Sequence, residues 1–143
     1  MKRTLIINCK IINEGKIEEN DILIEDGIIQ KIGKNLGTEG LSETIDAQGK
    51  YLMPGVIDDQ VHFREPGLTH KADIASESRA AVAGGTTSFM EMPNTVPNAL
   101  TQELLEDKYQ IAKQNSWANY SFFMGGSNDN YEEAMKTDLK NVC

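Results

Sequence analysis

Four polar residues spaced two positions apart could form a ligand-binding surface in the first half of the sequence: Asp58, Gln60, His62 and Arg64. They lie in and just after the segment 56–63, which is strand-like. Side chains two residues apart on a strand lie on the same face. Burying four polar groups on one face is costly unless they contact a ligand or one another. The spacing therefore predicts a binding site at the carboxyl end of this strand.

His62 and Arg64 have the most specific chemistry in this group. An imidazole nitrogen is a common metal ligand, although an isolated histidine is more often hydrogen-bonded within its own protein. The guanidinium group of Arg64 can hold a carboxylate with two parallel hydrogen bonds, whereas a surface ion pair would be its ordinary structural use. The presence of Arg64 two residues after His62, followed by Glu65-Pro66-Gly67, favours ligand binding by His62.

A second polar segment, 92–97, follows the next strand-like stretch. Asn94 is expected at the carboxyl end of that strand, beside the end of the first one. The flanking prolines also suit a simple turn residue, so both interpretations of Asn94 remain open. Gly84 and Gly85, which precede this strand, predict a helix C-cap and a tight loop, because no helix N-terminus follows them to bind phosphate.

The predicted secondary structure changes near residue 54, from strands alone to strands that alternate with helices. Residues 3–50 contain β-rich runs joined by turns, with a polar break at 8–10, and Asp26-Gly27 predicts a hairpin. Strand-like stretches then begin near residues 56, 86 and 119 and alternate with helix-like ones, the last of which starts at Tyr131. This repeat of roughly 30 residues is typical of parallel β/α units.

Parallel β/α units occur in doubly wound sheets and in (β/α)8 barrels, and the alternation alone fits both. A barrel typically needs about 250 residues, and the sequence reaches Cys143 without a helix-ending glycine. We therefore interpret the chain as a fragment. In the helix expected over 101–115, Thr101 is the predicted N-cap, and one face contains Leu104, Leu105, Lys108, Ile111 and Ala112.

Composition limits the partners and the location that we expect. The 143 residues are 39% hydrophobic and carry a net charge of -8, which argues against nucleic acid and anionic membrane surfaces as partners. No apolar stretch is long enough for a signal peptide or a membrane span. Cys9 and Cys143 predict neither a disulfide nor a metal site, so a cytoplasmic protein is expected.

These motifs resemble the cyclic-amide branch of the amidohydrolase superfamily, and within it the dihydroorotase family. The resemblance covers essentially the whole chain and is most specific in the segments 62–67, 79–87 and 92–95. Allantoinases usually have Asn at the position of Arg64, and hydantoinases diverge further. The chain is thus similar to the N-terminal portion of a dihydroorotase.

The resemblance implies a (β/α)8 metal-dependent hydrolase barrel, preceded by strands of a small β-sandwich domain built from both chain ends. Residues 1–53 would be the N-terminal strands of that composite sandwich, and residues 54–143 the first three β/α units of an incomplete barrel. The implied activity is zinc-dependent interconversion of dihydroorotate and N-carbamoyl-aspartate in pyrimidine biosynthesis. We expect the full-length protein to be a homo-oligomer and the fragment alone to be inactive.

The resemblance also implies roles for individual residues. His62 would be a zinc ligand, and Arg64 and Asn94 would hold the carboxylate of a small-molecule substrate. No catalytic residue is expected within this chain, because the general base and the other metal ligands come from later strands. Gln60 replaces the first histidine of the family's His-x-His motif, and a carboxamide oxygen is a weaker zinc ligand than imidazole. One or two zinc ions are implied, and our hypothesis is that Gln60 leaves one or none.

Two other functions remain open. An allantoinase or hydantoinase-type cyclic amidase would act on a different ring, and Arg64 argues against it because a carboxylate-bearing substrate gives that guanidinium group a purpose. A non-catalytic dihydroorotase-like structural subunit is the second alternative, and Gln60 is the residue that keeps it open.

Overall fold

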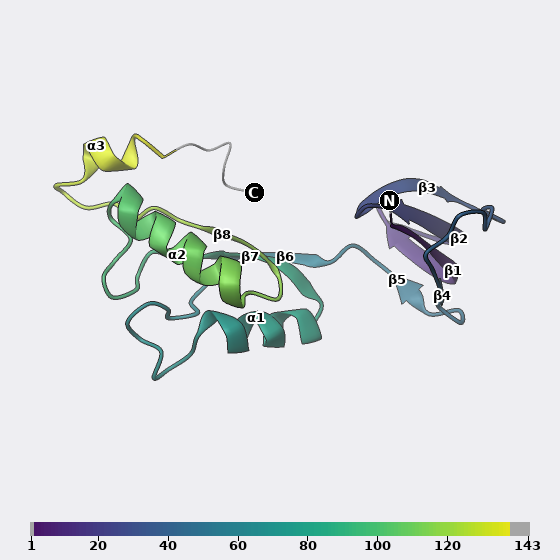
Figure 1. The fold of residues 1–143 in the computed structure, drawn as a ribbon, viewed down its shortest axis with the longest axis horizontal. Helices are drawn as coiled ribbons and strands as arrows, with labels where there is room; N and C mark the ends of the chain where they lie inside the picture. Colours follow the sequence, from purple (N-terminus) through teal and green to yellow (C-terminus); the bar gives the residue numbers. More distant parts are fainter. Residues whose placement is uncertain (1, 138–143) are drawn as a thin grey trace. The chain divides into compact units, whose positions relative to one another are not determined.

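The computed structural model describes residues 2–137 of the chain. The chain divides into two compact units, Met1–Pro54 and Gly55–Cys143. The first contains only strands, and the second combines parallel strands with helices (Figure 1).

The first unit is a five-stranded sheet made of β1 (Arg3–Asn13), β2 (Lys16–Glu25), β3 (Ile28–Gly33), β4 (Glu43–Asp46) and β5 (Tyr51–Leu52). The strand order is β3-β2-β1-β4, and β5 also pairs with β1. The hairpin predicted at Asp26-Gly27 is confirmed: β2 and β3 are antiparallel, and both turn residues have positive φ, 47° and 84°.

β1 differs from the sequence prediction of two short strands around a polar break. It is one continuous strand with a bulge between Ile6 and Cys9, where Asn8 has a φ of 55°. Asn tolerates this left-handed conformation better than most residues, so the chain absorbs an extra residue without ending the strand. The polar break in the sequence therefore marks a bulge rather than a turn.

The second unit contains the strands β6 (Val56–Val61), β7 (Thr86–Glu91) and β8 (Asn119–Phe122), and the helices α1 (Ile74–Ala83), α2 (Gln102–Asn115) and α3 (Tyr131–Ala134). The strands form a parallel sheet in the order β6-β7-β8. Their predicted starting points near residues 56, 86 and 119 are confirmed. The sequence predicts a third helix over residues 131–140. It begins at Tyr131 as predicted but ends at Ala134, and residues 138–140 lie outside the described residues.

Both long helices begin at side-chain caps. Asp73 Oδ1 accepts a hydrogen bond from Ser76 N at 2.7 Å at the start of α1. Thr101 Oγ1 accepts one from Leu104 N at 3.2 Å at the start of α2, so the predicted N-cap is confirmed. These caps fix where the loops that follow β6 and β7 end.

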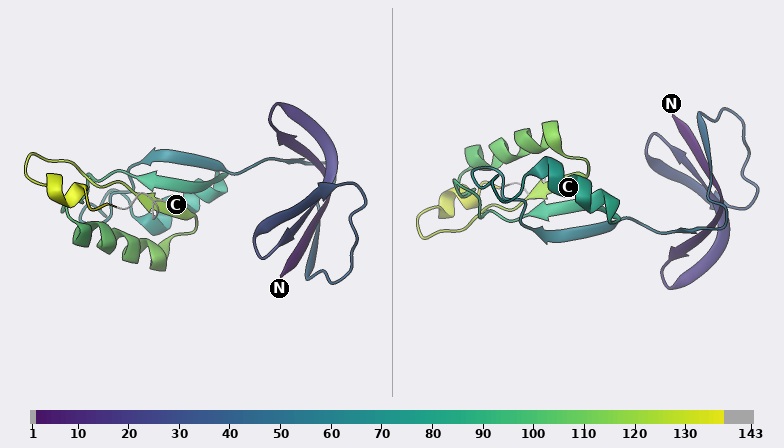
Figure 2. Two further views of the ribbon diagram at one scale, coloured as in Figure 1. Left: turned by 90° about the horizontal axis from the view of Figure 1, so that it is seen from above. Right: turned by 90° about the horizontal axis from the view of Figure 1, so that it is seen from below.

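α1 and α2 lie on one face of the β6-β7-β8 sheet in both views of Figure 2. The core between helices and sheet consists of Phe63, Ile74, Phe89, Leu105, Ala112 and Phe122. The rings of Phe63 and Phe89 have centroids 4.5 Å apart. Each of the buried Phe, Ile and Leu side chains stabilises the fold by roughly 1.5–3 kcal/mol. Because Phe63 directly follows His62, this core also anchors the end of β6.

Candidate functional site

His62 and Asn94 meet at the carboxyl ends of two neighbouring parallel strands. His62 follows β6, Asn94 follows β7, and His62 Nδ1 lies 2.9 Å from Asn94 Oδ1. The predicted position of Asn94 beside the end of the first strand is thereby confirmed. The side-chain oxygen of Asn94 can only accept a hydrogen bond, so the Nδ1–H group of His62 donates it. The other ring nitrogen of His62, Nε2, therefore keeps its lone pair. An imidazole oriented in this way is ready to bind a metal ion through Nε2.

The prediction that strict alternation holds from Asp58 to Arg64 is wrong. β6 pairs Asp58 with Phe89 and Val61 with Glu91, so three steps along β6 match two along β7, and a bulge lies between them. The strand ends at Val61, and Arg64 has a φ of 72°, which is outside the β region. Gln60 lies within this bulge and His62 beyond it, so neither shares a continuous pleat with Asp58.

Backbone contacts fix the place from which the Arg64 side chain projects. The N–H groups of Phe63 and Arg64 both donate to Glu91 Oε1, each at 3.0 Å. Arg64 O accepts from Leu68 N at 3.0 Å in the following turn. The half-buried Arg64 thus follows His62 by two residues, on a backbone held from both sides.

Glu91 is paired with Lys108 of α2. Glu91 Oε2 lies 3.1 Å from Lys108 Nζ, and the two side chains are 1% and 0% exposed. Lys108 Nζ also donates to Met92 O at 3.0 Å. Burial raises the pKa of the Glu91 carboxyl and lowers the pKa of the Lys108 amine, while each partner's charge opposes the shift of the other.

The sequence interpretation missed this pair as a functional feature. Lys108 is on the face of α2 that also carries Leu105 and Ala112, and Glu91 is two residues from the core residue Phe89. A charged residue at a core position of each element was the signal available in the sequence, since buried charges are rare unless they are paired.

The loops after β6 and β7 are in direct contact. Val96 N donates to Pro66 O at 3.1 Å. Gly67 has a φ of 83°, and a Cβ atom there would lie 1.9 Å from Val96 O. Glu65 Oε2 accepts from Ile74 N at 2.9 Å, which ties the first loop to the start of α1. The segments that carry Arg64 and Asn94 are therefore packed against each other.

The metal-binding capacity of the described residues is limited. Within residues 2–137, no group of three or more His, Cys, Asp or Glu side chains is arranged to hold a metal ion. His62 offers one imidazole nitrogen, and Gln60 is an exposed carboxamide on β6. His62 fits a metal ligand set as one member, and the described part of the chain does not complete such a set.

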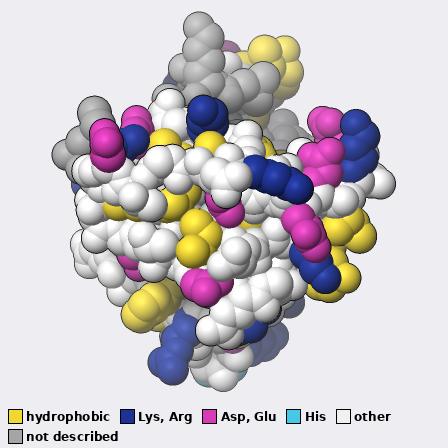
Figure 3. Space-filling model, turned by 90° about the vertical axis from the view of Figure 1, so that its right-hand side faces the viewer, with side chains coloured by type: hydrophobic (Ala, Val, Ile, Leu, Met, Phe, Trp, Pro, Cys, Tyr) yellow, Lys and Arg dark blue, Asp and Glu magenta, His cyan; other side chains and the backbone are white. Residues whose placement is uncertain are grey.

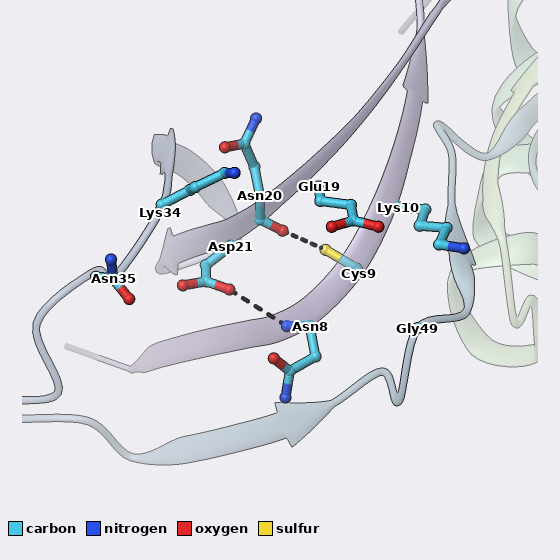
Figure 4. Close-up of a pocket in the computed structure, with 9 residues that line it drawn as sticks. All are labelled: Asn8, Cys9, Lys10, Glu19, Asn20, Asp21, Lys34, Asn35 and Gly49. Atoms are coloured by element: carbon cyan, nitrogen blue, oxygen red, sulfur yellow. Dashed lines mark hydrogen bonds between the residues drawn. The ribbon is translucent and has the colours of Figure 1, made fainter.

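The β-strand unit has a polar cavity of about 350 Å³, which contains none of the predicted site residues. Asn8 and Cys9 of the β1 bulge are among the residues that line this cavity (Figure 4). Asn8 N donates to Asp21 Oδ1 at 3.2 Å, and the Cys9 thiol donates to Asn20 O at 2.9 Å. Burial raises the pKa of the Cys9 thiol, so this cysteine is not activated as a nucleophile.

The surface drawn in Figure 3 carries interspersed charges, with Lys and Arg side chains next to Asp and Glu side chains. On that face, the described residues form no extended surface of a single sign.

No helix within the described range 2–137 has the length and apolar character needed to cross a membrane.

Comparison with known proteins gives a consistent set of relatives. Residues 49–130 match the family described as dihydro-orotase-like. A dihydroorotase from Trichlorobacter lovleyi is 53% identical over 85 residues, which are 59% of this chain and 20% of that protein. A dihydroorotase from Enterococcus faecalis is 38% identical over 115 residues, which are 80% of this chain and 27% of the relative.

Solved structures of similar fold include an L-hydantoinase from Arthrobacter aurescens, with a TM-score of 0.82 and 34% identity over 93% of this chain and 30% of that one. A dihydropyrimidinase from Brevibacillus agri has a TM-score of 0.80 and 26% identity over 97% of this chain and 31% of that one. The chain spans between a fifth and just over a quarter of these two dihydroorotase relatives' length. Its mixed α/β fold thus resembles one portion of larger proteins.

Proposed function

The chain belongs to the dihydroorotase-like family, and on that premise we propose that the full-length protein containing it is a cyclic amide hydrolase that interconverts dihydroorotate and N-carbamoyl-aspartate. The observation that carries this proposal is the His62–Asn94 contact of 2.9 Å at the carboxyl ends of β6 and β7. It brings a metal-ligand candidate next to an amide suited to a carboxylate, and Arg64, whose guanidinium group suits the same ligand, follows His62 by two residues.

The proposal includes a complete (β/α)8 barrel and a β-sandwich finished by other segments of the full-length protein. The exposed apolar residues Val56 and Ile57 on β6 support further packing in the α/β unit. In the β-strand unit, an apolar cavity of about 220 Å³ lies among Ile6, Ile11, Ile22, Ile24, Ile29, Ile32, Leu52 and Met53. Apolar surface of this kind is ordinarily covered in a finished protein.

In the proposed reaction, the residues of this chain bind and orient the substrate. Arg64 would donate two hydrogen bonds to the carboxylate of dihydroorotate, and Asn94 would hold His62 through Nδ1 while contacting the same carboxylate. His62 Nε2 would be one ligand of zinc, which supplies Lewis-acid activation of the ring amide and of water. The proton-transferring base would come from a segment outside this chain. A cytoplasmic homo-oligomer acting in pyrimidine biosynthesis is the setting that we propose.

Turnover by the zinc-depleted and zinc-reconstituted full-length protein tests this function. We expect dihydroorotate hydrolysis that returns with zinc and exceeds hydantoin hydrolysis at least about 100-fold in kcat/KM, because only dihydroorotate gives Arg64 a carboxylate. Hydrolysis of hydantoin but not of dihydroorotate would instead assign the protein to the hydantoinase type. A folded protein inactive toward both at every zinc concentration would support the non-catalytic subunit that Gln60 keeps open.

The presence of Gln60 in place of a histidine leads to a prediction of the zinc content of the full-length protein. We expect the full-length wild-type protein to hold about one zinc ion per chain or fewer, and Gln60→His to raise that number, because imidazole binds zinc better than a carboxamide oxygen does. Elemental analysis after dialysis against a weak chelator measures both proteins, with Gln48→His as a control in the β-strand unit. Two tightly held zinc ions in the wild type would contradict the prediction.

A further inference from the structure

One buried carboxylate connects the two strands whose ends form the candidate site. Glu91 is the last residue of β7, and its Oε1 accepts from the N–H groups of Phe63 and Arg64 beyond the end of β6. Two adjacent N–H groups converging on one oxygen fix the orientation of both peptide planes. Arg64 has a φ of 72° at this point. Arginine rarely adopts that conformation, and it persists only where neighbouring contacts enforce it.

Lys108 holds the other side of this connection. Its Nζ lies 3.1 Å from Glu91 Oε2 and donates to Met92 O at 3.0 Å. Met92 is two residues before Asn94. The ammonium group therefore holds the carboxylate that positions Arg64 and also the backbone that leads to Asn94. Both proposed carboxylate-binding residues are tied to one buried ion pair through backbone contacts.

Core packing alone does not account for this pair. A buried ion pair is expensive, and an apolar pair of similar volume is often as stable or more stable. An apolar replacement at position 91 would, however, leave the Phe63 and Arg64 N–H groups without their acceptor. Glu91 and Lys108 contact the backbone of the two loops that carry Arg64 and Asn94. A binding site needs a fixed geometry in these loops.

We propose that Glu91 and Lys108 are positioning residues that set the spacing of Arg64 and Asn94 for binding a substrate carboxylate. This inference rests on the function proposed above. Neither residue touches the substrate in this proposal. Their effect reaches it through the backbone of the segments 63–64 and 92–94.

Kinetics of the full-length protein with Lys108→Met test this role. We expect KM for dihydroorotate to rise at least about tenfold while kcat stays within about threefold, because the carboxylate contacts serve ground state and transition state alike. Zinc content should be unchanged. Lys136→Met is the matched control, since it removes an exposed lysine that pairs with Glu133 on α3, and its KM should equal that of the wild type.

A double variant separates positioning from general damage to the fold. In Glu91→Gln/Lys108→Met, the carboxamide oxygen can still accept from Phe63 and Arg64, and neither buried charge remains. We expect the part of the KM increase that comes from Arg64 to be recovered, and the part that comes from Asn94 to remain, because methionine cannot donate to Met92 O. A lower melting temperature with an unchanged KM in Lys108→Met, or a loss confined to kcat, would overturn the positioning role. If Lys108→Met does not fold, an unchanged KM in Glu91→Asp, whose shorter side chain withdraws the acceptor from the Phe63 and Arg64 N–H groups, would overturn it equally.

Calorimetric binding of orotate keeps this inference distinct from the proposed function. If the wild-type protein binds orotate without turning over dihydroorotate, the proposed activity fails and the positioning role is judged by affinity alone. Binding at least about tenfold weaker in Lys108→Met than in Lys136→Met would support the role, and equal binding would overturn it. A folded wild-type protein that neither binds orotate nor turns over dihydroorotate would overturn both.

Discussion

Replacing Arg64 with alanine in the full-length protein is expected to lower kcat/KM for dihydroorotate by about 1,000-fold. Two charge-assisted hydrogen bonds to a carboxylate contribute roughly 2 kcal/mol each, and each factor of ten corresponds to about 1.4 kcal/mol. The loss should appear mainly in KM, because the carboxylate is not part of the reacting amide. Steady-state kinetics with the zinc-loaded protein measure the effect.

Two further variants make the Arg64 result specific. Arg64→Lys keeps the positive charge but loses the planar pair of donors, so we expect a loss intermediate between wild type and Arg64→Ala. Arg79→Ala removes an exposed arginine on α1 and should leave both constants near their wild-type values. An unchanged KM in Arg64→Ala would remove Arg64 from carboxylate binding and would return it to an ordinary structural role.

The parts of this structure that depend on local sequence could be predicted. The alternation of strands and helices, the N-cap at Thr101 and the hairpin at Asp26-Gly27 each depend on a few neighbouring residues. The meeting of His62 with Asn94 also followed, because parallel strands bring their carboxyl ends to the same edge of a sheet. No conformation of the individual side chains was needed for that prediction.

The remaining features depend on contacts between distant residues. The side chains of β6 do not alternate strictly between the two faces of the sheet, because pairing with β7 introduces a bulge. The polarity of the β6 residues does not show which residues of β7 they pair with. The positive φ of Arg64 depends on Glu91, which is 27 residues away. The sequence places Lys108 on the apolar face of its helix and Glu91 near Phe89, but only the packed fold pairs the two charges in the core.

Gly67→Ala is expected to reduce kcat/KM for dihydroorotate at least about 100-fold, since displacing catalytic or binding groups by about 1 Å has effects of that size. Two features of Gly67 lead to this expectation. Its φ of 83° is strained for alanine, and the new Cβ atom would meet Val96 O at 1.9 Å. The carbonyl of Val96 belongs to the backbone, so the loops carrying Arg64 and Asn94 would have to separate.

The control for this prediction is another glycine of the same unit. Gly126 does not have a positive φ, and a Cβ atom there would meet no atom within 4 Å, so Gly126→Ala should keep nearly wild-type kinetics and melting temperature. Gly67→Ala should also lower the melting temperature, because alanine at positive φ costs roughly 1 kcal/mol even without the clash. Equal activity in the two variants would show that contact between the loops 64–67 and 93–97 does not control the site. The arrangement of Arg64 and Asn94 would then have to depend on the Glu91–Lys108 pair and on the His62–Asn94 contact.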